Sequence, residues 1–599
     1  MKIFFSMRHL GSFRMYEPTI REMAGRGHHL HLALGRAEAL GWEKALHTLI
    51  ADHPAITWTW LSPTASSFWS EVAKTIRLWA DYLRYFQPQY DSTPKLKARA
   101  EERVPPRLVR LTNRPAFQKP ANRRRLLSVL RTLERALPPV PEIEEQLRAE
   151  RPDMVLITPL VYLGSSQFEV LRTSLSMGLR TVFCVGSWDH LSSKALIRDM
   201  PQRVLVWNDT QRDEAIQLHG VPADRVVVTG AQCYDQWFGR LPVRSREEFS
   251  RRVGLPADRP FILYVCSALF WGSPIEAEFV RRWVQSLRES AHPKLRNAAV
   301  LIRPHPARMD EWNTVDLSAF EGVTLYGSNP VDAASKDDYF ESLYYSSAVA
   351  GLNTSAFLEG AIVGRPVHTV LLPEFHENQE GTLHFHYLMT VGGGALQAGR
   401  SFEEHHQQLA ASLRLPASPC PLPPDFVQAF VRPHGLERPA TPVFCDAVDQ
   451  VLALPAPAPE PAPFRFVLLR WAIYPVLHLL RWTYGADVIR DDWSRKEREQ
   501  RQRREARVRA REERVRVSDQ QKQARDQQRA ATLAAREAVV HARDAERQRG
   551  EAEKARRKQE REREKAARTR QRGRAAMRAR IKHGAKGWLA RWRPGREVT

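Results

Sequence analysis

Several hydroxyl side chains and one carboxylate lie in residues 344–372, a stretch whose pattern could bind a phosphorylated group. A small polar turn, GLNTS, follows an apolar run there and precedes a segment of helical character. Free backbone N–H groups and the helix dipole stabilise an anion at such a turn, and Thr354 and Ser355 add hydroxyl donors. Glu359 lies one helical turn further on, spaced to reach a sugar hydroxyl. The pattern predicts a sugar-phosphate site; the alternative is a capped helix in an ordinary βαβ unit.

A second candidate group lies in LIRPHP, residues 301–306, where an apolar run ends. The prolines on either side of His305 restrict the backbone. A rigid loop of this kind suits an imidazole that contacts a phosphate. The alternative is a turn histidine that binds no ligand.

Together, GLNTSAFLEGAIVGRPV and RPHP resemble the donor-binding region of GT-B-type transferases. They are most similar to the bacterial CDP-glycerol glycerophosphotransferases and surface-polysaccharide glycosyltransferases, which pair a segment like GxNTSxxxE…GxPV with RPHP. The later segment ENQEGTLHFH resembles the loop that closes the donor pocket in the same group. The resemblance implies that a nucleotide-activated donor is contacted by Arg303, His305, Asn353, Thr354, Ser355, Glu359, Gln379, Gly381 and Thr382.

In the first half of the chain, the polar loop SWDHLSSK, residues 187–194, follows an apolar run. Parallel sheets place their sites in loops of this kind. The loop resembles SWDNLTSK in the same enzyme group, from which His190 and Ser192 depart. Asp189 and His190 are the carboxylate and imidazole best suited to deprotonate an acceptor hydroxyl. The alternative is that Trp188 packs and Asp189 caps a helix.

His9 is the third candidate catalytic residue. It follows a predicted strand at residues 2–6, and a helix from about 16 to 24 and a strand at 29–34 come next. This pattern resembles the first βαβ unit of many GT-B N-terminal domains, in which the opening loop faces the acceptor. His9 and Glu17 are therefore candidates for the acceptor side; an ordinary loop histidine is the alternative for His9.

These candidates lie in two separate runs of alternating strands and helices. The runs predict an α/β fold with two Rossmann-like, GT-B-like domains, at 1–235 (acceptor) and 259–450 (donor), facing each other across a cleft. Residues 66–150 interrupt the first run with helices that carry basic faces. This insertion could cover an anionic or lipid-linked acceptor, or it could be the solvated face of a helical bundle.

The last part of the chain departs from the enzyme pattern. Residues 452–463 form a Pro/Ala linker, and 464–484 form an apolar helix with interspersed tryptophans and arginines. Three arginines and Pro475 argue against a free-standing membrane span, whereas aromatics with arginines suit a helix lying in a membrane interface. The alternative is a helix packed on the globular body.

Residues 485–599 form a basic tail. From Arg495 onward about 36 Lys and Arg accompany about 16 Asp and Glu, so about +20 of the net charge of +23 lies there. Opposite charges recur at helical spacing and support a long helix; a single helix, a coiled coil and a partly disordered segment all remain open. The many glutamates break up the basic surface, which makes nucleic acid an unlikely partner.

Cysteines and acidic residues indicate neither disulfides nor a metal. The five cysteines form no CxxC pair, which favours free thiols in a reducing compartment and a cytoplasmic protein. Asp337 and Asp338 look like helix caps rather than a metal-binding pair. No cofactor is expected, and we expect no essential metal.

The sequence therefore predicts a metal-independent transferase that moves a glycosyl or glycerophosphate group from a nucleotide-activated donor to a cell-envelope polysaccharide or a lipid-linked acceptor. The tail would hold it at the inner face of the cell membrane, on anionic lipid. Three alternatives are a nucleotide-sugar epimerase of similar fold, a nucleic-acid- or partner-binding protein acting through the basic tail, and an inactive scaffold.

Overall fold

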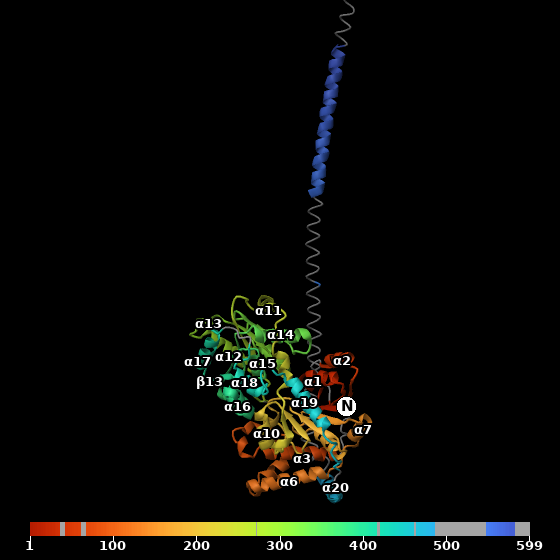
Figure 1. The fold of residues 1–599 in the computed structure, drawn as a ribbon. Coiled ribbons are helices and arrows are strands. Elements are labelled where there is room, and N and C mark those ends of the chain that lie inside the picture. The colour runs from red at the N-terminus through yellow and green to blue at the C-terminus, as the bar shows by residue number, and fades with distance from the viewer. Residues whose placement is uncertain are drawn as a thin grey trace, which may run out of the picture. The chain divides into compact units, whose positions relative to one another are not determined.

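The computed structural model describes residues 1–35, 42–61, 68–270, 272–415, 420–460, 463–484, 527 and 547–580. The chain divides into two compact units, Met1–Glu497 and Arg498–Thr599 (Figure 1). The first unit contains two parallel sheets with helices, which confirms the predicted α/β fold with two Rossmann-like domains.

The first domain is built on a parallel sheet of strand order β3-β2-β1-β4-β5-β6-β7. Its central strands are almost entirely buried because helices cover both faces, as apolar runs such as IFFSM and MVLIT require. The strands are β1 (Lys2–Met7), β2 (His29–Leu34), β3 (Ile56–Trp60), β4 (Met154–Thr158), β5 (Arg180–Cys184), β6 (Arg203–Val206) and β7 (Val226–Val228). The helices that connect them are α1 (Glu17–Gly25), α2 (Trp42–Asp52), α8 (Gln167–Ser176), α9 (His190–Ser193) and α10 (Asp209–His219).

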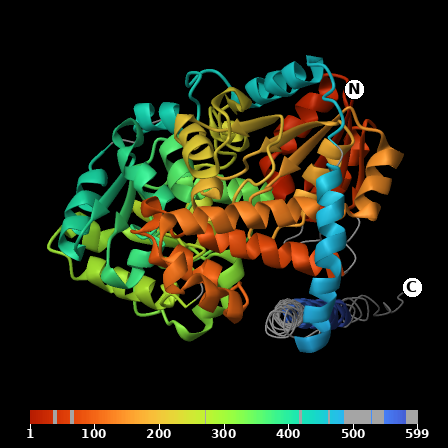
Figure 2. The same ribbon diagram turned by 90° about the horizontal axis from the view of Figure 1, so that it is seen from below.

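The insertion between β3 and β4 is helical, as its sequence predicts. Its helices are α3 (Phe68–Arg84), α4 (Pro94–Glu101), α5 (Pro106–Thr112), α6 (Pro120–Ala136) and α7 (Pro141–Glu150). The two long helices, α3 and α6, lie side by side along one flank of the sheets (Figure 2).

A buried ion network attaches the insertion to the first sheet. Arg77 on α3 donates to Glu134 on α6 at 2.6 Å and to Glu169 on α8. Arg198 binds Asp81 at 2.7 Å and Glu134 at 3.2 Å. All five side chains are at least 94% buried. Because losing one partner would leave a buried charge unpaired, the network fixes where the insertion lies.

The second domain is built on a parallel sheet of order β10-β9-β8-β11-β12-β13. Its strands are β8 (Phe261–Val265), β9 (Ala299–Arg303), β10 (Val323–Leu325), β11 (Ala348–Ala350), β12 (Val367–Val370) and β13 (Leu396–Gly399). Its helices are α11 (Arg246–Val253), α12 (Glu276–Arg288), α13 (Pro293–Asn297), α14 (Ala333–Tyr344), α15 (Ala356–Ile362), α16 (Leu383–Thr390), α17 (Phe402–Ser412) and α18 (Pro424–Phe430).

The chain passes between the domains twice, and both passages meet at Asp235. This carboxylate accepts hydrogen bonds from Arg432 at 2.8 Å and from the backbone of Ala440 and Thr441 at 3.0 and 2.6 Å. Beyond this point α19 (Ala440–Ala453) packs on α1 and completes the core of the first domain. The two sheets are therefore tied together near one point.

One prediction about the second domain is wrong. Asp337 and Asp338 do not cap a helix, because α14 begins four residues earlier and Asp332 is its capping residue. Asp338 instead lies within α14 and binds Arg244 and Arg252 at 2.7 and 2.8 Å. Ion pairs between Asp338 and these two arginines, at the start of the second domain, thus take the place of the predicted cap.

The helix α20 (Phe464–Tyr484) lies against the end of the insertion (Figure 2). Arg470 donates to the carbonyl of Ala136 at 2.8 Å, and the rings of Trp69 and Tyr474 lie 5.6 Å apart. Among the described residues no helix is both long and apolar enough to cross a bilayer.

The second unit is described at 527 and over 547–580, which are helical and almost wholly exposed. Ion pairs one turn apart, such as Arg557 with Glu553 at 2.9 Å, support this helix. The rest of the predicted tail, including the basic aromatic end at 587–593, lies outside the described residues.

Candidate functional site

On the second domain, the predicted donor residues gather where β9 and β11 end. The turn after β11 approaches the end of β8 so closely that a side chain at Gly351 would meet the carbonyl of Val265 at 2.8 Å. This glycine lets the turn lie against the sheet, with Ser355 exposed at the start of α15. Thr354 accepts a hydrogen bond from the backbone of Ala356 at 3.3 Å, which orders the turn.

Glu359 sits beneath this turn in a setting that favours its protonated form. Burial raises its pKa to about 7, although Tyr339, Arg14 and Arg303 each act to lower it. The Tyr339 hydroxyl donates a hydrogen bond to the Glu359 carboxyl group, and the Arg303 guanidinium lies 5.0 Å from the Tyr339 ring centre. Arg303 itself is buried and donates to Ser342 at 3.0 Å. Arg303 therefore helps to position the Tyr339 ring and, through it, the Glu359 side chain.

His305, after β9, presents a neutral imidazole. Burial, Arg308 and Arg14 together lower its pKa to about 4, and burial has the largest effect. Its Nδ1 accepts a hydrogen bond from the backbone of Ala307 at 3.2 Å, which places the ring proton on Nε2. The rigid loop predicted from the two prolines thus holds a hydrogen-bond donor suited to a phosphate or sugar oxygen.

Arg14 links the two domains and was not predicted from the sequence. It lies on η1 (Leu10–Met15) of the first domain, is exposed, and acts on the pKa of both Glu359 and His305 of the second. Its placement depends on how the domains meet, so no local motif marks it. An exposed guanidinium that acts on both a carboxyl and an imidazole is well placed to meet a diphosphate.

On the first domain, Asp189 is held as an ion pair. Burial alone would raise its pKa, but Lys194, 2.9 Å away, together with His190, His384 and Ser187, outweighs burial and holds the pKa well below its usual value. Ser187 and Ser193 also donate to its two oxygens, at 2.7 and 3.2 Å. A carboxylate so fully engaged is a weak proton acceptor and orients Lys194 instead.

His190 and His9 flank this ion pair. Burial lowers the pKa of His190 to about 4, so its ring is neutral at pH 7, and His9 acts on the same pKa. The Nδ1 atom of His190 is buried without a hydrogen-bond partner. The structure thus brings all three predicted catalytic residues to the end of the strands β1 and β5.

The two halves of the site meet directly. The ring of Trp188 packs edge-on against His384 of α16, with centroids 4.8 Å apart. Tyr234 also lies between the halves: burial raises its pKa, and Glu359 and Asp189 are both near enough to raise it further. Donor and acceptor candidates therefore share one region.

Four predicted donor residues make contacts within the second domain. Gln379 and Thr382 are fully buried; the Gln379 amide donates to Thr369 at 2.9 Å, and Thr382 donates to the Gln379 carbonyl at 2.9 Å. Gly381 is buried in the same loop, and Asn353 gives its side-chain amide to the Asn378 carbonyl. These contacts order the loop, and direct contact of the four residues with a donor stays a prediction.

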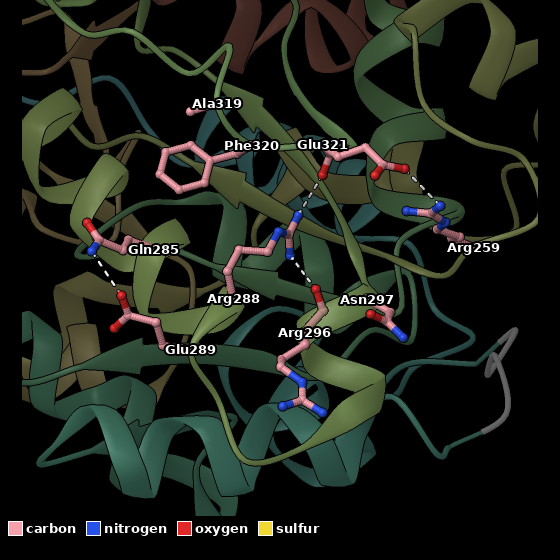
Figure 3. A pocket seen from close by; sticks show the side chains of 9 residues that line it. All are labelled: Arg259, Gln285, Arg288, Glu289, Arg296, Asn297, Ala319, Phe320 and Glu321. Atoms are coloured by element: carbon pink, nitrogen blue, oxygen red, sulfur yellow. Dashed lines mark hydrogen bonds and ion pairs between the residues drawn. The ribbon is translucent and has the colours of Figure 1, made fainter.

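A separate cavity of about 590 Å³ lies on the second domain (Figure 3). It is lined by residues that precede β8, β9 and β10, at the amino ends of the strands. Arg288, at its centre, is already bound to the carbonyls of Arg296 and Glu321 at 3.0 Å each. Parallel sheets bind ligands at the carboxyl ends of their strands, so this cavity is not the candidate site.

In the part of the chain that the structure describes, no cluster of His, Cys, Asp or Glu is suited to a metal ion. The described cysteines are free, and Cys420 is the exposed one.

No protein-family model and no curated protein matches the sequence. Solved structures that resemble it include a UDP-GlcNAc 2-epimerase from Neisseria meningitidis bound to UDP-GlcNAc (10% identity, 75% of this chain and 100% of that one, TM-score 0.43). Another is WaaG, a glycosyltransferase of lipopolysaccharide biosynthesis (13% identity, 76% of this chain and 100% of that one, TM-score 0.38). A third is a glycosyltransferase from Rickettsia africae (11% identity, 76% of this chain and 99% of that one, TM-score 0.42). Scores this low identify no activity.

The raised pKa of Glu359 predicts a pH-dependent stability. Because the pKa is near 7 in the folded state and 4.5 in the unfolded chain, the stability from this group is fully present below pH 4.5 and lost as the pH rises through 7. Glu359→Gln is neutral throughout. Its unfolding free energy relative to wild type should therefore rise by about 2–3 kcal/mol between pH 5 and pH 8, measured by urea denaturation.

The matched control is Glu278→Gln on the exposed side of α12, where water surrounds the side chain in both states. Profiles of wild type and Glu359→Gln that stay parallel from pH 5 to 8 would show that Glu359 is not held in this setting.

Proposed function

We propose that the protein is a transferase that uses a nucleotide-activated sugar or glycerol phosphate. One observation supports the proposal: Arg14 of the first domain acts on both His305 after β9 and Glu359 after β11, at the carboxyl ends of these strands. A carboxyl, an imidazole N–H and a guanidinium are the groups that hydroxyls and a diphosphate require.

In this proposal the donor nucleotide binds the second domain. Ser355, Thr354 and the neighbouring backbone amides bind phosphate, and the Nε2–H of His305 makes a further contact. Glu359 binds a hydroxyl of the ribose of the donor nucleotide. Developing charge on the leaving diphosphate is met by these donors and by Arg14, so the step needs no divalent metal.

The acceptor, a polysaccharide or lipid-linked glycan, binds the first domain. His190 is proposed to accept the proton of its hydroxyl, because the Nδ1 of its neutral ring has no hydrogen-bond partner among the described residues, whereas the oxygens of Asp189 are engaged. His9 is proposed to lie beside it on the acceptor side. Asp189 is then a positioning residue that orients Lys194.

The donor assignment predicts how nucleotide binding responds to mutation. His305→Ala and Glu359→Ala should each weaken UDP or CDP binding by about 1.5–3 kcal/mol, roughly 10- to 150-fold in Kd, because each removes a hydrogen bond to a charged or polar group. Isothermal titration calorimetry on the full chain measures this. Arg296→Ala, at the amino-edge cavity, is the control and should leave Kd unchanged. Unaltered affinity in both site variants would refute the donor assignment.

Turnover distinguishes a transferase from an epimerase. Incubated with UDP- or CDP-activated sugars alone, a transferase leaves the sugar unchanged, and it releases free nucleotide once cell-envelope glycan is added. An epimerised sugar without any acceptor would show the epimerase instead.

EDTA should leave the transfer rate within about twofold; loss of activity that Mn²⁺ restores would contradict the metal-independent step.

The exposed face of α20 supports a membrane location. Phe464, Leu468, Trp471 and Leu479 recur at helical spacing and are 54–74% exposed, while Arg470 on another face binds the insertion. An apolar stripe of this kind, followed by the basic tail, suits the surface of an anionic membrane. We propose that the protein works at the cytoplasmic face of the cell membrane.

This location predicts that the full chain floats with anionic liposomes. Leu468→Glu with Trp471→Glu should abolish most of the salt-resistant flotation, because two inserted side chains become charged. Leu241→Glu with Leu415→Glu, at exposed apolar positions elsewhere, is the matched control and should still float. A chain ending near Ala456 should stay at the bottom. If the full chain also stays down at low salt, the membrane role is wrong.

A further inference from the structure

The insertion places two arginines beside the catalytic loop of the first domain. Arg99 and Arg103 lie on or just after α4, and Arg99 donates to the carbonyl of Ser193 at the end of that loop. The Arg99 guanidinium also lies 5.2 Å from the ring centre of Phe270, on the loop after β8. The insertion, the first domain and the second domain therefore meet at Arg99.

Two more cations complete a cluster around Tyr162. The Arg8 guanidinium lies 3.6 Å from the centre of the Tyr162 ring, and the Lys194 ammonium lies 5.6 Å from it. Lys194 lowers the pKa of the Tyr162 hydroxyl, and Arg8 and Arg99 lower it further. Tyr162 is also near Arg103, because its charge acts on the pKa of that arginine. Arg8, Arg99, Arg103 and Lys194 are called the Tyr162 cluster below.

Among the described residues, acidic groups offset only part of the charge of Arg99, Arg103 and Lys194. Asp189 pairs with Lys194 at 2.9 Å. Burial raises the pKa of Glu214 to about 8, so this carboxyl is largely uncharged at pH 7. Glu101 accepts a hydrogen bond from Tyr82. Glu102 is exposed, and its charge raises the pKa of Arg103 by less than burial and Arg99 lower it. Burial and Arg99 both lower the pKa of Arg103, as expected where cations are crowded together.

The crowding is costly without a ligand. Like charges in a partly buried site repel each other, and the Nε atom of Arg99 is buried without a hydrogen-bond partner. An oxyanion would relieve both effects, because guanidinium groups bind phosphate through paired N–H donors and an ammonium adds a point charge. A neutral sugar would accept the hydrogen bond but would not relieve the repulsion.

We propose that the Tyr162 cluster is an acceptor subsite for a phosphate group, so that the acceptor is a phosphorylated or phosphodiester-containing glycan or lipid carrier. The statement that the bound molecule is the acceptor rests on the proposed function, but the anion subsite itself does not. The cluster lies on the first domain and the insertion, beside His9 and His190, whereas the donor residues lie on the second domain. A phosphate bound there holds the neighbouring hydroxyl of the acceptor near the two imidazoles.

Glycerol 3-phosphate and glycerol are the probes that test the subsite. The full chain, first saturated with UDP, is titrated with each by calorimetry at 50 mM salt. The phosphate ester should bind and glycerol should not. Arg99→Gln with Arg103→Gln should weaken glycerol 3-phosphate binding at least tenfold and leave the UDP affinity within twofold. Arg103→Gln alone, which keeps the contacts of Arg99, should weaken it about threefold and guards against misfolding.

The matched control is Arg124→Gln with Arg125→Gln, which removes the same charge from exposed positions of α6 in the same insertion. It should leave glycerol 3-phosphate binding within twofold. Equal losses in both double variants would reduce the effect to net charge and overturn the subsite. A loss of UDP affinity in Arg99→Gln/Arg103→Gln would assign the cluster to the donor diphosphate and also overturn it. If UDP does not bind but glycerol 3-phosphate binds in an Arg99- and Arg103-dependent way, the proposed donor fails and the subsite stands.

Discussion

The common direction of the strands is the constraint on which the rest of the structure depends. Within each sheet the strands pair in parallel, so every loop that follows a strand emerges at the same edge. On the first sheet this edge collects His9 and Asp189, and on the second it collects His305 and the turn before Glu359. At the opposite edge, Arg288 in the centre of the cavity is already bound to two backbone carbonyls.

The site also depends on how the two edges are held together. Both passages of the chain between the domains are tied at Asp235, and α19 returns to the first core. This arrangement lets Arg14 act across the gap on Glu359 and lets Trp188 pack on His384. The insertion forms a third side of the candidate site. Its buried ion pairs keep Arg99 near the loop at residues 187–194. Relative motion of the domains about Asp235 would change the distance between donor and acceptor groups without disturbing either sheet.

Much of the fold could be predicted from the sequence because apolar runs and glycine turns mark buried parallel strands; the strand predicted at 2–6 is Lys2–Met7. The turn after β11 and the loop of His305 were found because their chemistry is local. Arg14, Tyr339 and Arg99 were missed because contacts between distant segments place them. The sequence does not distinguish the two roles open to Gln379 and Thr382, because a polar side chain that bonds a buried group of the protein and one that faces a ligand have the same local sequence.

The central claim is that a nucleotide binds at the carboxyl edge of the second sheet. Hydrogen exchange of the full chain with and without saturating UDP tests it most directly, because each backbone segment reports separately. The account predicts slower exchange at residues 303–310 and 351–360, and at the Arg14 segment across from them. Protection confined to 285–297 and 319–321, around the amino-edge cavity, or no protection of either edge, would contradict it.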